Sequence, residues 1–476
     1  MKKLLLTLAA ICLLGAAASA ERKEVHILSV NDMHAKIENM PQLAAIADSL
    51  RALYPDLLII SAGDNRTGEP LNDLYEIPAY PMVALMNQIG FDCSTLGNHE
   101  FDSGPEGLAT LINLSNFPYM CANVHPDPKM GIHLSPFKIF EVNGIRVGIV
   151  GAVALGTSGH PDTHPDNCKG INFTQVYDTL SDYDWLREEC NVVILLSHLG
   201  YEDDVAIAYD LPWVDLIIGG HSHTQLDGGE VHSGVMITQN TNRLKRVTHI
   251  VITLNDGTVE KITASNIEIE GYPRKNKIVD EMVKYFSANP AFKRVLCQFD
   301  APVSTYEELG CMMTDALRVE TGADIALTNY GGIRYDTLAA GPFTVSDVLR
   351  LDPFGNEAVE LRLTGDELRA MLISCYVNDQ DRFPVTSGIN CYVTKDKSNP
   401  QQIKDVRITW PDGRKFDLKK SYRVVTNSYT AVISDSPRKD QGHGMNRQTS
   451  ALIQDYLEHQ GHVNYAGAKR IFESEK

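Results

Sequence analysis

The sequence predicts a layered α/β fold in which helices cover mixed sheets, followed by a second α/β unit. Short apolar runs such as Val25–Val30 alternate with longer amphipathic stretches such as Pro41–Leu53. Several runs, Val192–Leu196 among them, are continuously apolar, which is typical of strands buried on both faces. Strands that alternate with helices in this way pack as sheets with helices on their faces.

The strands of the first unit, which we expect over residues 21–270, follow the apolar runs along the chain. Helices are expected between them, for example at Pro41–Leu53 and Pro81–Ile89. The last strand ends at Asp256-Gly257, a turn signal. The expected strands are Val25–Val30, Leu57–Ile60, Val147–Val150, Val192–Leu196, Leu216–Ile218, Val235–Thr238 and Val247–Leu254.

The pattern changes near Gly271, where we expect a helical connector over residues 271–295. Val279, Val283 and Phe286 recur at helical spacing, so Asn276–Lys293 is predicted to be a single amphipathic helix. Residues 296–476 are predicted to form the second unit. Its expected elements are helices at Gly310–Glu320, Gly365–Tyr376 and Thr449–His459, a strand at Ile325–Thr328, a turn at Asn329–Arg334 and a β-rich stretch at Cys391–Val425.

Residues 1–20 have the pattern of a cleaved signal peptide. Lys2 and Lys3 precede the apolar run Leu4–Leu14, and Ala18-Ser19-Ala20 is a small-residue cleavage site. The apolar run is too short to span a bilayer, and no transmembrane segment is expected after it. We therefore expect a mature chain that begins near Glu21 and lies in the periplasm or the extracellular space.

The composition restricts the classes of partner. The 476-residue chain carries a formal net charge of −18, which disfavours nonspecific binding to nucleic acid or to an anionic membrane. An anionic small molecule would need a local positive charge, such as bound metal ions, to enter that field. The cysteines after residue 20 are widely spaced and form no CxxC zinc signature; most are expected to be buried thiols, and disulfide pairing stays open. Oligomeric state also stays open.

Metal-binding residue types follow the predicted strands at or near the points where they end. In open α/β sheets, sites form outside the carboxyl ends of the strands, so five separate segments can converge on one place. Their side chains are carboxylates, imidazoles and one amide, without a thiolate. The candidate ligands are Asp32, His34, Asp64, Asn98, His198, His221 and His223.

Seven ligands are too many for one tetrahedral ion and indicate a two-metal site. Two ions about 3.5–4 Å apart can share a bridging carboxylate, polarise phosphoryl oxygens and lower the pKa of a bound water. Asp64 is the natural bridge, because Gly63 before it permits close backbone approach. Mixed nitrogen and oxygen ligands fit zinc, manganese, iron or cobalt, and the sequence does not rank these four.

These motifs resemble those of the calcineurin-like metallophosphoesterases, and their order along the mature chain resembles the secreted 5′-nucleotidases. The resemblance rests on Asp32-x-His34, Gly63-Asp64, Gly97–Asp102, Ser197-His198 and Gly219–His223, and in the second unit on Asn329–Arg334 and Asp352–Asn356. It implies a calcineurin-like sandwich followed by a 5′-nucleotidase C-terminal domain. It further implies that one ion is held by Asp32, His34, Asp64 and His223, and the other by Asp64, Asn98, His198 and His221.

The resemblance also implies roles for residues that do not bind the metals. His99 would lie beside the phosphate as a catalytic residue, oriented by Asp102. Substrate contacts would come from Asn329, Gly332, Arg334 and Phe354, with Phe354 stacked on the base.

The second unit departs from the family pattern at two places. An arginine usually precedes a Gly-Asn-Leu helix start, whereas this chain has Thr305–Met312, with Arg318 as the nearby candidate for a replacement. The late Gly-Gly-Asp-Gly-aromatic motif is missing, and Tyr429 is the candidate for the second base-stacking ring. These departures leave the preferred base and phosphate position open.

The expected function is therefore that of an exported 5′-nucleotidase, which removes phosphate from nucleotides by attack of a metal-bound hydroxide. Alternatives with the same metals are a 2′,3′-cyclic nucleotide phosphodiesterase with 3′-nucleotidase activity, a nucleotide-sugar hydrolase and a sulfur-compound hydrolase. An alternative of another class is a non-enzymatic nucleotide-capturing protein. That alternative predicts missing ligands, whereas all seven ligands and His99 are present.

Overall fold

The computed structural model describes residues 21–156, 158–288, 290–379, 382–396, 399 and 402–475. The predicted signal peptide, residues 1–20, lies outside this part of the chain. Among the described residues, no helix is long and apolar enough to cross a membrane. The eight cysteines of the described ranges are buried and unpaired, as most were expected to be.

Two six-stranded sheets form the centre of the first unit. The first contains, in spatial order, β14 (Thr258–Glu268), β13 (Arg246–Asn255), β1 (Arg22–Val30), β2 (Leu58–Ser61), β3 (Cys93–Thr95) and β4 (Tyr119–Met120). The second contains β11 (Glu230–His232), β12 (Val235–Thr238), β10 (Leu216–Ile218), β9 (Val192–His198), β7 (Ile145–Val153) and β6 (Phe137–Val142). Both sheets are mixed, since β1 pairs antiparallel with β13 but parallel with β2, and β7 pairs antiparallel with β6 but parallel with β9.

The two sheets pack face to face with helices on their outer faces. Ile27 and Ile60 of the first sheet share a buried core with Ile149 and Leu196 of the second. Strand side chains alternate between faces, so the neighbouring Leu28 packs outward into a separate core with the helices. One outer face carries α2 (Met40–Arg51), α4 (Tyr80–Ile89) and α5 (Gly104–Leu114), and the other carries α6 (Val176–Ser181), α7 (Leu186–Glu189) and α8 (Tyr201–Asp210). The predicted layered α/β sandwich is confirmed.

The connector contains a shorter helix than the sequence pattern predicts. α9 (Lys277–Phe286) is capped by Asn276, whose side chain accepts from the Ile278 and Val279 amides, and the helix packs on the first unit. A separate 3-10 turn follows at Pro290–Lys293. The prediction of one helix from Asn276 to Lys293 was wrong, because proline disfavours helical backbone at the residue before it and cannot donate a helical hydrogen bond.

The second unit is built on a five-stranded sheet. Its strands are, in spatial order, β19 (Val385–Ser387), β16 (Ile325–Thr328), β22 (Ser421–Asn427), β18 (Glu357–Thr364) and β23 (His443–Gln448). Two three-stranded sheets flank it: β17 (Gly341–Thr344), β15 (Val295–Phe299) and β24 (His462–Val463), and β21 (Ile403–Thr409), β20 (Asn390–Lys395) and β25 (Ile471–Glu475).

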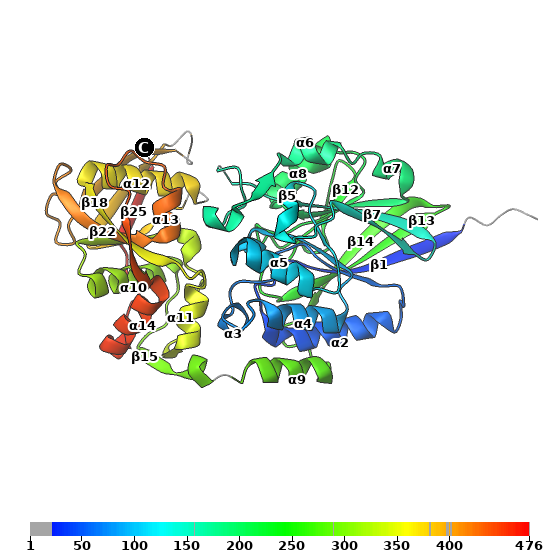
Figure 1. The fold of residues 1–476 in the computed structure, drawn as a ribbon, viewed down its shortest axis with the longest axis horizontal. Coiled ribbons are helices and arrows are strands. Elements are labelled where there is room, and N and C mark those ends of the chain that lie inside the picture. Colours follow the sequence, from blue (N-terminus) through cyan, green and yellow to red (C-terminus); the bar gives the residue numbers. More distant parts are fainter. Residues whose placement is uncertain are drawn as a thin grey trace, which may run out of the picture.

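Helices cover the sheets of the second unit. They are α10 (Tyr306–Thr321), α11 (Val345–Leu351), α12 (Gly365–Asn378), α13 (Ser428–Ile433) and α14 (Thr449–Gln460). Figure 1 shows the two units side by side, with α9 and β15 leading from one to the other. Ion pairs also join the two units directly, since Arg350 of α11 reaches Glu69 at 2.5 Å and Glu38 at 2.9 Å.

Candidate active site

The candidate ligands follow strand ends at one edge of the two sheets. Asp32 and His34 follow β1, Asp64 follows β2, His198 ends β9, and His221 follows β10. Five of the seven adopt positive φ angles: Asp32 48°, His34 44°, Asp64 51°, His221 75° and His223 55°. Non-glycine residues rarely take this conformation, and such strain concentrates at functional sites.

The first group of ligand atoms belongs to Asp32, His34 and His223, whose donor atoms all lie within 4.8 Å of one another. The Nε2 atoms of His34 and His223 are 3.2 Å apart, and His223 Nε2 is 3.3 Å from Asp32 Oδ1. His34 Nδ1 lies 3.0 Å from the Thr67 carbonyl, to which it donates as the protonated nitrogen. The lone pair of His34 Nε2 therefore points into the group.

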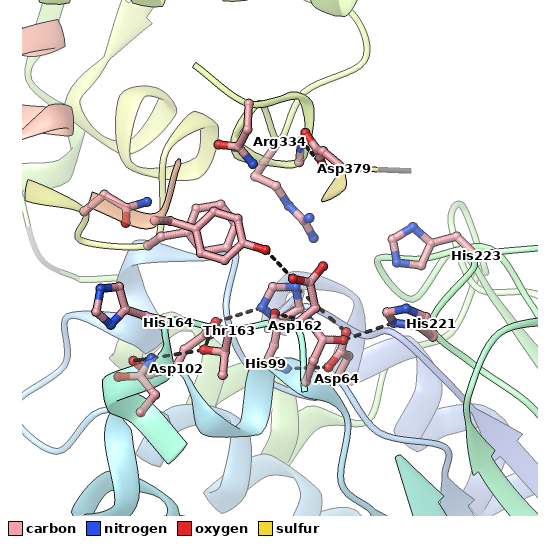
Figure 2. A pocket seen from close by; sticks show the side chains of 18 residues that line it. Asp64, His99, Asp102, Asp162, Thr163, His164, His221, His223, Arg334 and Asp379 are labelled. Carbon is pink, nitrogen blue, oxygen red and sulfur yellow. Dashed lines mark hydrogen bonds and ion pairs between the residues drawn. The ribbon is translucent and has the colours of Figure 1, made fainter. Parts of the chain in front are cut away.

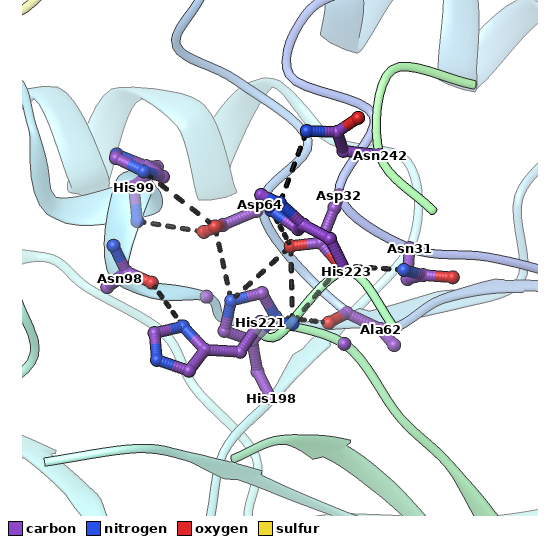
Figure 3. Close-up of polar contacts among 12 residues, drawn as sticks. Asn31, Asp32, Ala62, Asp64, Asn98, His99, His198, His221, His223 and Asn242 are labelled. Carbon is purple, nitrogen blue, oxygen red and sulfur yellow. Dashed lines mark hydrogen bonds and ion pairs between the residues drawn. The ribbon is translucent and has the colours of Figure 1, made fainter. Parts of the chain in front are cut away.

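The second group lies around Asp64 and His198 (Figure 3). His198 Nδ1 donates to the Ala62 carbonyl at 2.6 Å, which directs Nε2 toward Asp64. That Nε2 is 3.2 Å from Asp64 Oδ2 and has no hydrogen-bond partner, although the side chain is fully buried. Next to it, His221 Nδ1 faces Asn98 Oδ1 at 3.1 Å.

The seven side chains, which we call the ligand cluster, have the chemistry of a cation site. Buried acceptors face one another at close range, and burial of unpaired acceptors is unfavourable. Burial opposes ionisation of Asp32, but His223 and His198 hold its pKa below the ordinary value. Burial lowers the pKa of His198, yet Asp64 raises it to about 10. A cation at the centre would supply the positive charge that these carboxylates otherwise draw from protonated histidine.

His99 lies beside the cluster, where Figure 3 places it next to Asp64. Its Nδ1 is 2.8 Å from Asp102 Oδ2, and its Nε2 is 3.9 Å from Asp64 Oδ2. Thr163 Oγ1 donates to the other Asp102 oxygen at 2.9 Å. Burial lowers the pKa of His99, but the charges of Asp64 and Asp102 raise it above the ordinary value. The imidazole is thus oriented through Nδ1 and presents Nε2 as a proton donor.

Glu100 is a site residue that the sequence interpretation missed. Its buried carboxylate accepts from three backbone amides: Asp64 at 2.9 Å, Asn65 at 2.8 Å and Gly97 at 2.6 Å. It thereby ties the turn after β2 to the turn that carries Asn98 and His99. Its position three residues after Gly97 matches a capping box, so a signal was present in the sequence.

The second unit closes the site from the opposite side (Figure 2). A cleft between the units is lined by Asp64, His99, His221 and His223 on one side and by Asn329, Gly332, Arg334 and Phe354 on the other. Arg334 Nη2 lies 3.4 Å from His34 Nε2, and its guanidinium lies over the Phe354 ring at 5.6 Å. The Phe354 ring also stacks on His99 at 5.8 Å. All four predicted substrate residues therefore line the same cleft as the ligand cluster.

The two candidates for missing family residues have different positions. Tyr429 lines the cleft, and its hydroxyl donates to the Asp162 carboxylate of the first unit. Arg318 does not line the cleft; its Nε donates to Ser387 Oγ at 2.7 Å. Asp379, another residue of the second unit that lines the cleft, was not anticipated.

Comparison with known proteins defines the class. Residues 25–225 match the family of calcineurin-like phosphoesterases, and residues 295–436 match the C-terminal domain of 5′-nucleotidases. Together with the ligand cluster, these matches make the chain a metal-dependent phosphoester hydrolase. The two matches lie in the order of a calcineurin-like phosphoesterase domain followed by a 5′-nucleotidase C-terminal domain.

Individual relatives cover most of this chain. The trifunctional nucleotide phosphoesterase protein YfkN of Bacillus subtilis is 26% identical over 87% of this chain, which spans only 32% of that protein. A 5′-nucleotidase of Vibrio cholerae is 26% identical, covering 91% of this chain and 90% of its own. The crystal structure of a 5′-nucleotidase precursor from Thermus thermophilus matches with a TM-score of 0.84 at 25% identity, covering 95% of this chain and 99% of that one.

Proposed function

We propose that the protein is an exported 5′-nucleotidase that uses two divalent metal ions. The observation that carries this proposal is the cleft itself, in which the ligand cluster faces an arginine and aromatic rings of the second unit. A nucleotide has a phosphate that suits the cluster and an aromatic base that suits the rings. The names of the Vibrio and Thermus relatives support the same substrate class.

The metal ligands would divide into two sets around the shared Asp64. Asp32, His34, Asp64 and His223 would hold one ion, and Asp64, Asn98, His198 and His221 the other. The contacts of His223 with Asp32 and His34, and of His198 with Asp64, support this division. Bound ions of this kind polarise phosphoryl oxygens and activate water. Nitrogen and oxygen ligands leave zinc, manganese, iron and cobalt as candidates.

His99 and Arg334 would stabilise the charge that develops as the phosphoester bond breaks. Asp102 accepts from His99 Nδ1, and the charges of Asp64 and Asp102 favour the protonated ring. The protonated ring can donate its Nε2 proton to a phosphoryl oxygen or to the leaving oxygen. Arg334 reaches the cluster from the second unit and offers its guanidinium to the phosphoryl group. Fixed donors of this kind, placed where negative charge develops, lower the barrier to hydrolysis.

The nucleoside would lie against the second unit. Phe354 provides a ring for base stacking, and Tyr429 provides a second ring in the same cleft. Asn329 and Gly332 belong to the turn between β16 and Arg334, beside these rings. Closure of the two units about the connector over residues 271–295 would bring the nucleoside face to the metals, as the Arg350–Glu69 pair supports.

The test is phosphate release by the purified protein, loaded with manganese or zinc, from matched 5′-, 3′- and 2′,3′-cyclic nucleotides. Release from 5′-monophosphates that a chelator abolishes is the expected result. Release from cyclic or 3′ substrates alone would keep the metal chemistry and overturn the 5′ assignment. Binding of nucleotides without hydrolysis of any of them would instead establish a nucleotide-capturing protein. Export is tested separately by locating the full-length chain after cell fractionation.

A further inference from the structure

Asp379 is a carboxylate that the proposed mechanism does not use. It caps the C-terminal end of α12, lines the cleft and is only 9% exposed. Three features make this an unfavourable place for a negative charge. The side chain is desolvated, the C-terminal end of a helix carries partial negative charge, and the cleft is proposed to receive an anion.

The side-chain oxygen of the neighbouring Asn329 has no acceptor capacity left for a substrate. Its Oδ1 accepts from Asn427 Nδ2 at 3.0 Å and from Thr430 Oγ1 at 3.1 Å, and all three side chains are buried. A carbonyl oxygen has two lone pairs, so these two bonds satisfy it. Asn329 therefore serves mainly to hold the turn, and the acceptor on this wall of the cleft is Asp379.

The Asp379 carboxylate has both a fixed position and spare capacity. The amide of Gly331 donates to it at 3.1 Å, and a side chain at Gly331 would come within 3.1 Å of Asp379 Oδ1. The residue before it, Asn378, donates to the Ile433 carbonyl at 3.0 Å, which ties the end of α12 to the helix that carries Tyr429. An ionised carboxylate has about four acceptor sites. The Tyr330 amide and the Asn329 side chain also act on Asp379 as donors, so about one site is left for a ligand in the cleft.

The order of groups along the cleft indicates which part of a nucleotide meets Asp379. Arg334 reaches His34 and marks the phosphate end. Tyr429, which contacts Asp162, marks the aromatic end. Asp379 contacts Gly331, on the turn that leads to Arg334, and Figure 2 draws it beside Arg334. In a nucleotide the sugar lies between phosphate and base, and its hydroxyls are hydrogen-bond donors.

We propose that Asp379 is a specificity-determining residue that accepts hydrogen bonds from the sugar hydroxyls, so that the cleft selects ribonucleotides over 2′-deoxyribonucleotides. This inference rests on the proposed function and specifies the substrate class of the same cleft. Burial raises the pKa of Asp379 to about 6, so the carboxylate is an ionised acceptor at neutral pH. Loss of one hydrogen bond to an ionised acceptor corresponds to a preference of about 10-fold.

The experiment compares kcat/KM for a 5′-ribonucleotide with that for its 2′-deoxy and 3′-deoxy counterparts, in the wild type, Asp379→Asn and Asp379→Ala. The wild type should prefer the ribonucleotide by about 10-fold. Both variants should lose that preference because the ribonucleotide value falls, while the values for the deoxy substrates change little. Asp435→Asn, an exposed carboxylate of the same unit, is the matched control and should keep the wild-type ratio.

Each other result would overturn the inference. Equal losses of kcat/KM on the ribo and deoxy substrates would show that Asp379 has only a structural role. A changed ratio of kcat/KM between adenine and hypoxanthine nucleotides, with the sugar preference intact, would show that Asp379 contacts the base instead. Calorimetric binding of the ribo and deoxy 5′-monophosphates to the metal-free protein gives a readout independent of turnover. If no nucleotide is hydrolysed, the proposed function fails, and equal calorimetric affinities would then reject the role of Asp379 as well.

Discussion

Replacement of Glu100 by glutamine tests whether one buried carboxylate holds the metal-bearing turns together. Oε2 of Glu100 accepts from the Asp64 and Gly97 amides, and Oε1 accepts from the Asn65 amide. Glutamine keeps the shape but turns one acceptor into an NH2 donor. In its better orientation the amide oxygen keeps two of the bonds, and the NH2 group faces a backbone donor at the third.

The loss of one bond to an ionised acceptor, together with an unsatisfied buried amide, lowers the free energy of unfolding by about 3 kcal/mol. Because the displaced amide belongs to Asn65, next to the candidate ligand Asp64, turnover should also fall by about 100-fold, the effect of a misplacement of about 1 Å. Urea unfolding measures the first quantity, and phosphate release from a nucleotide measures the second.

Glu106→Gln, an exposed glutamate on the nearby α5, is the matched control and should behave like the wild type. Burial and the charge of Asp64 raise the pKa of Glu100, whereas the amide donors favour its ionised form. Wild-type stability and turnover in Glu100→Gln would show that the carboxyl is held protonated, since glutamine would then mimic it. That result would refute the reasoning.

Two further predictions concern the His99–Asp102 pair and the interface between the units. His99→Ala should keep its metal content by elemental analysis but lose turnover by about 100- to 1,000-fold, since it removes a proton donor rather than a ligand; undiminished turnover would contradict the assigned role. Arg350→Gln removes the ion pairs to Glu69 and Glu38, so the radius of gyration in X-ray scattering and the KM for nucleotides should both rise. Arg369→Gln, which loses only an exposed ion pair with Asp366, is the control. Identical scattering curves for the two variants would show that the Arg350 ion pairs do not hold the units together.

The ligand cluster could be predicted because its signal is local. Asp32, Asp64 and His198 each lie at or just after an apolar run, and parallel strand ends converge by the geometry of the sheet. Residues of the second unit could be placed only through resemblance. Phe354 and Arg334 carry no periodic signal of their own, and the structure brings both into the cleft.

The missed features depend on contacts between distant segments. Saturation of Asn329 needs Asn427 and Thr430, almost a hundred residues away, and the contact of Tyr429 with Asp162 crosses from one unit to the other. No periodicity or motif encodes such pairs. The end of α9 is different, because the proline at 290 is a stop signal in the sequence, although the hydrophobic spacing before it is helical.

The cleft is divided between two units, and this division would separate hydrolysis from the choice of substrate. All seven members of the ligand cluster come from residues 32–223, whereas the rings and Asp379 come from residues 354–429. Substitutions at the rings or at Asp379 would therefore alter which phosphate ester is accepted, whereas a substitution at Arg334 of the same unit would also affect its cleavage. The first unit would carry out the hydrolysis, and the second unit would determine which leaving group is bound.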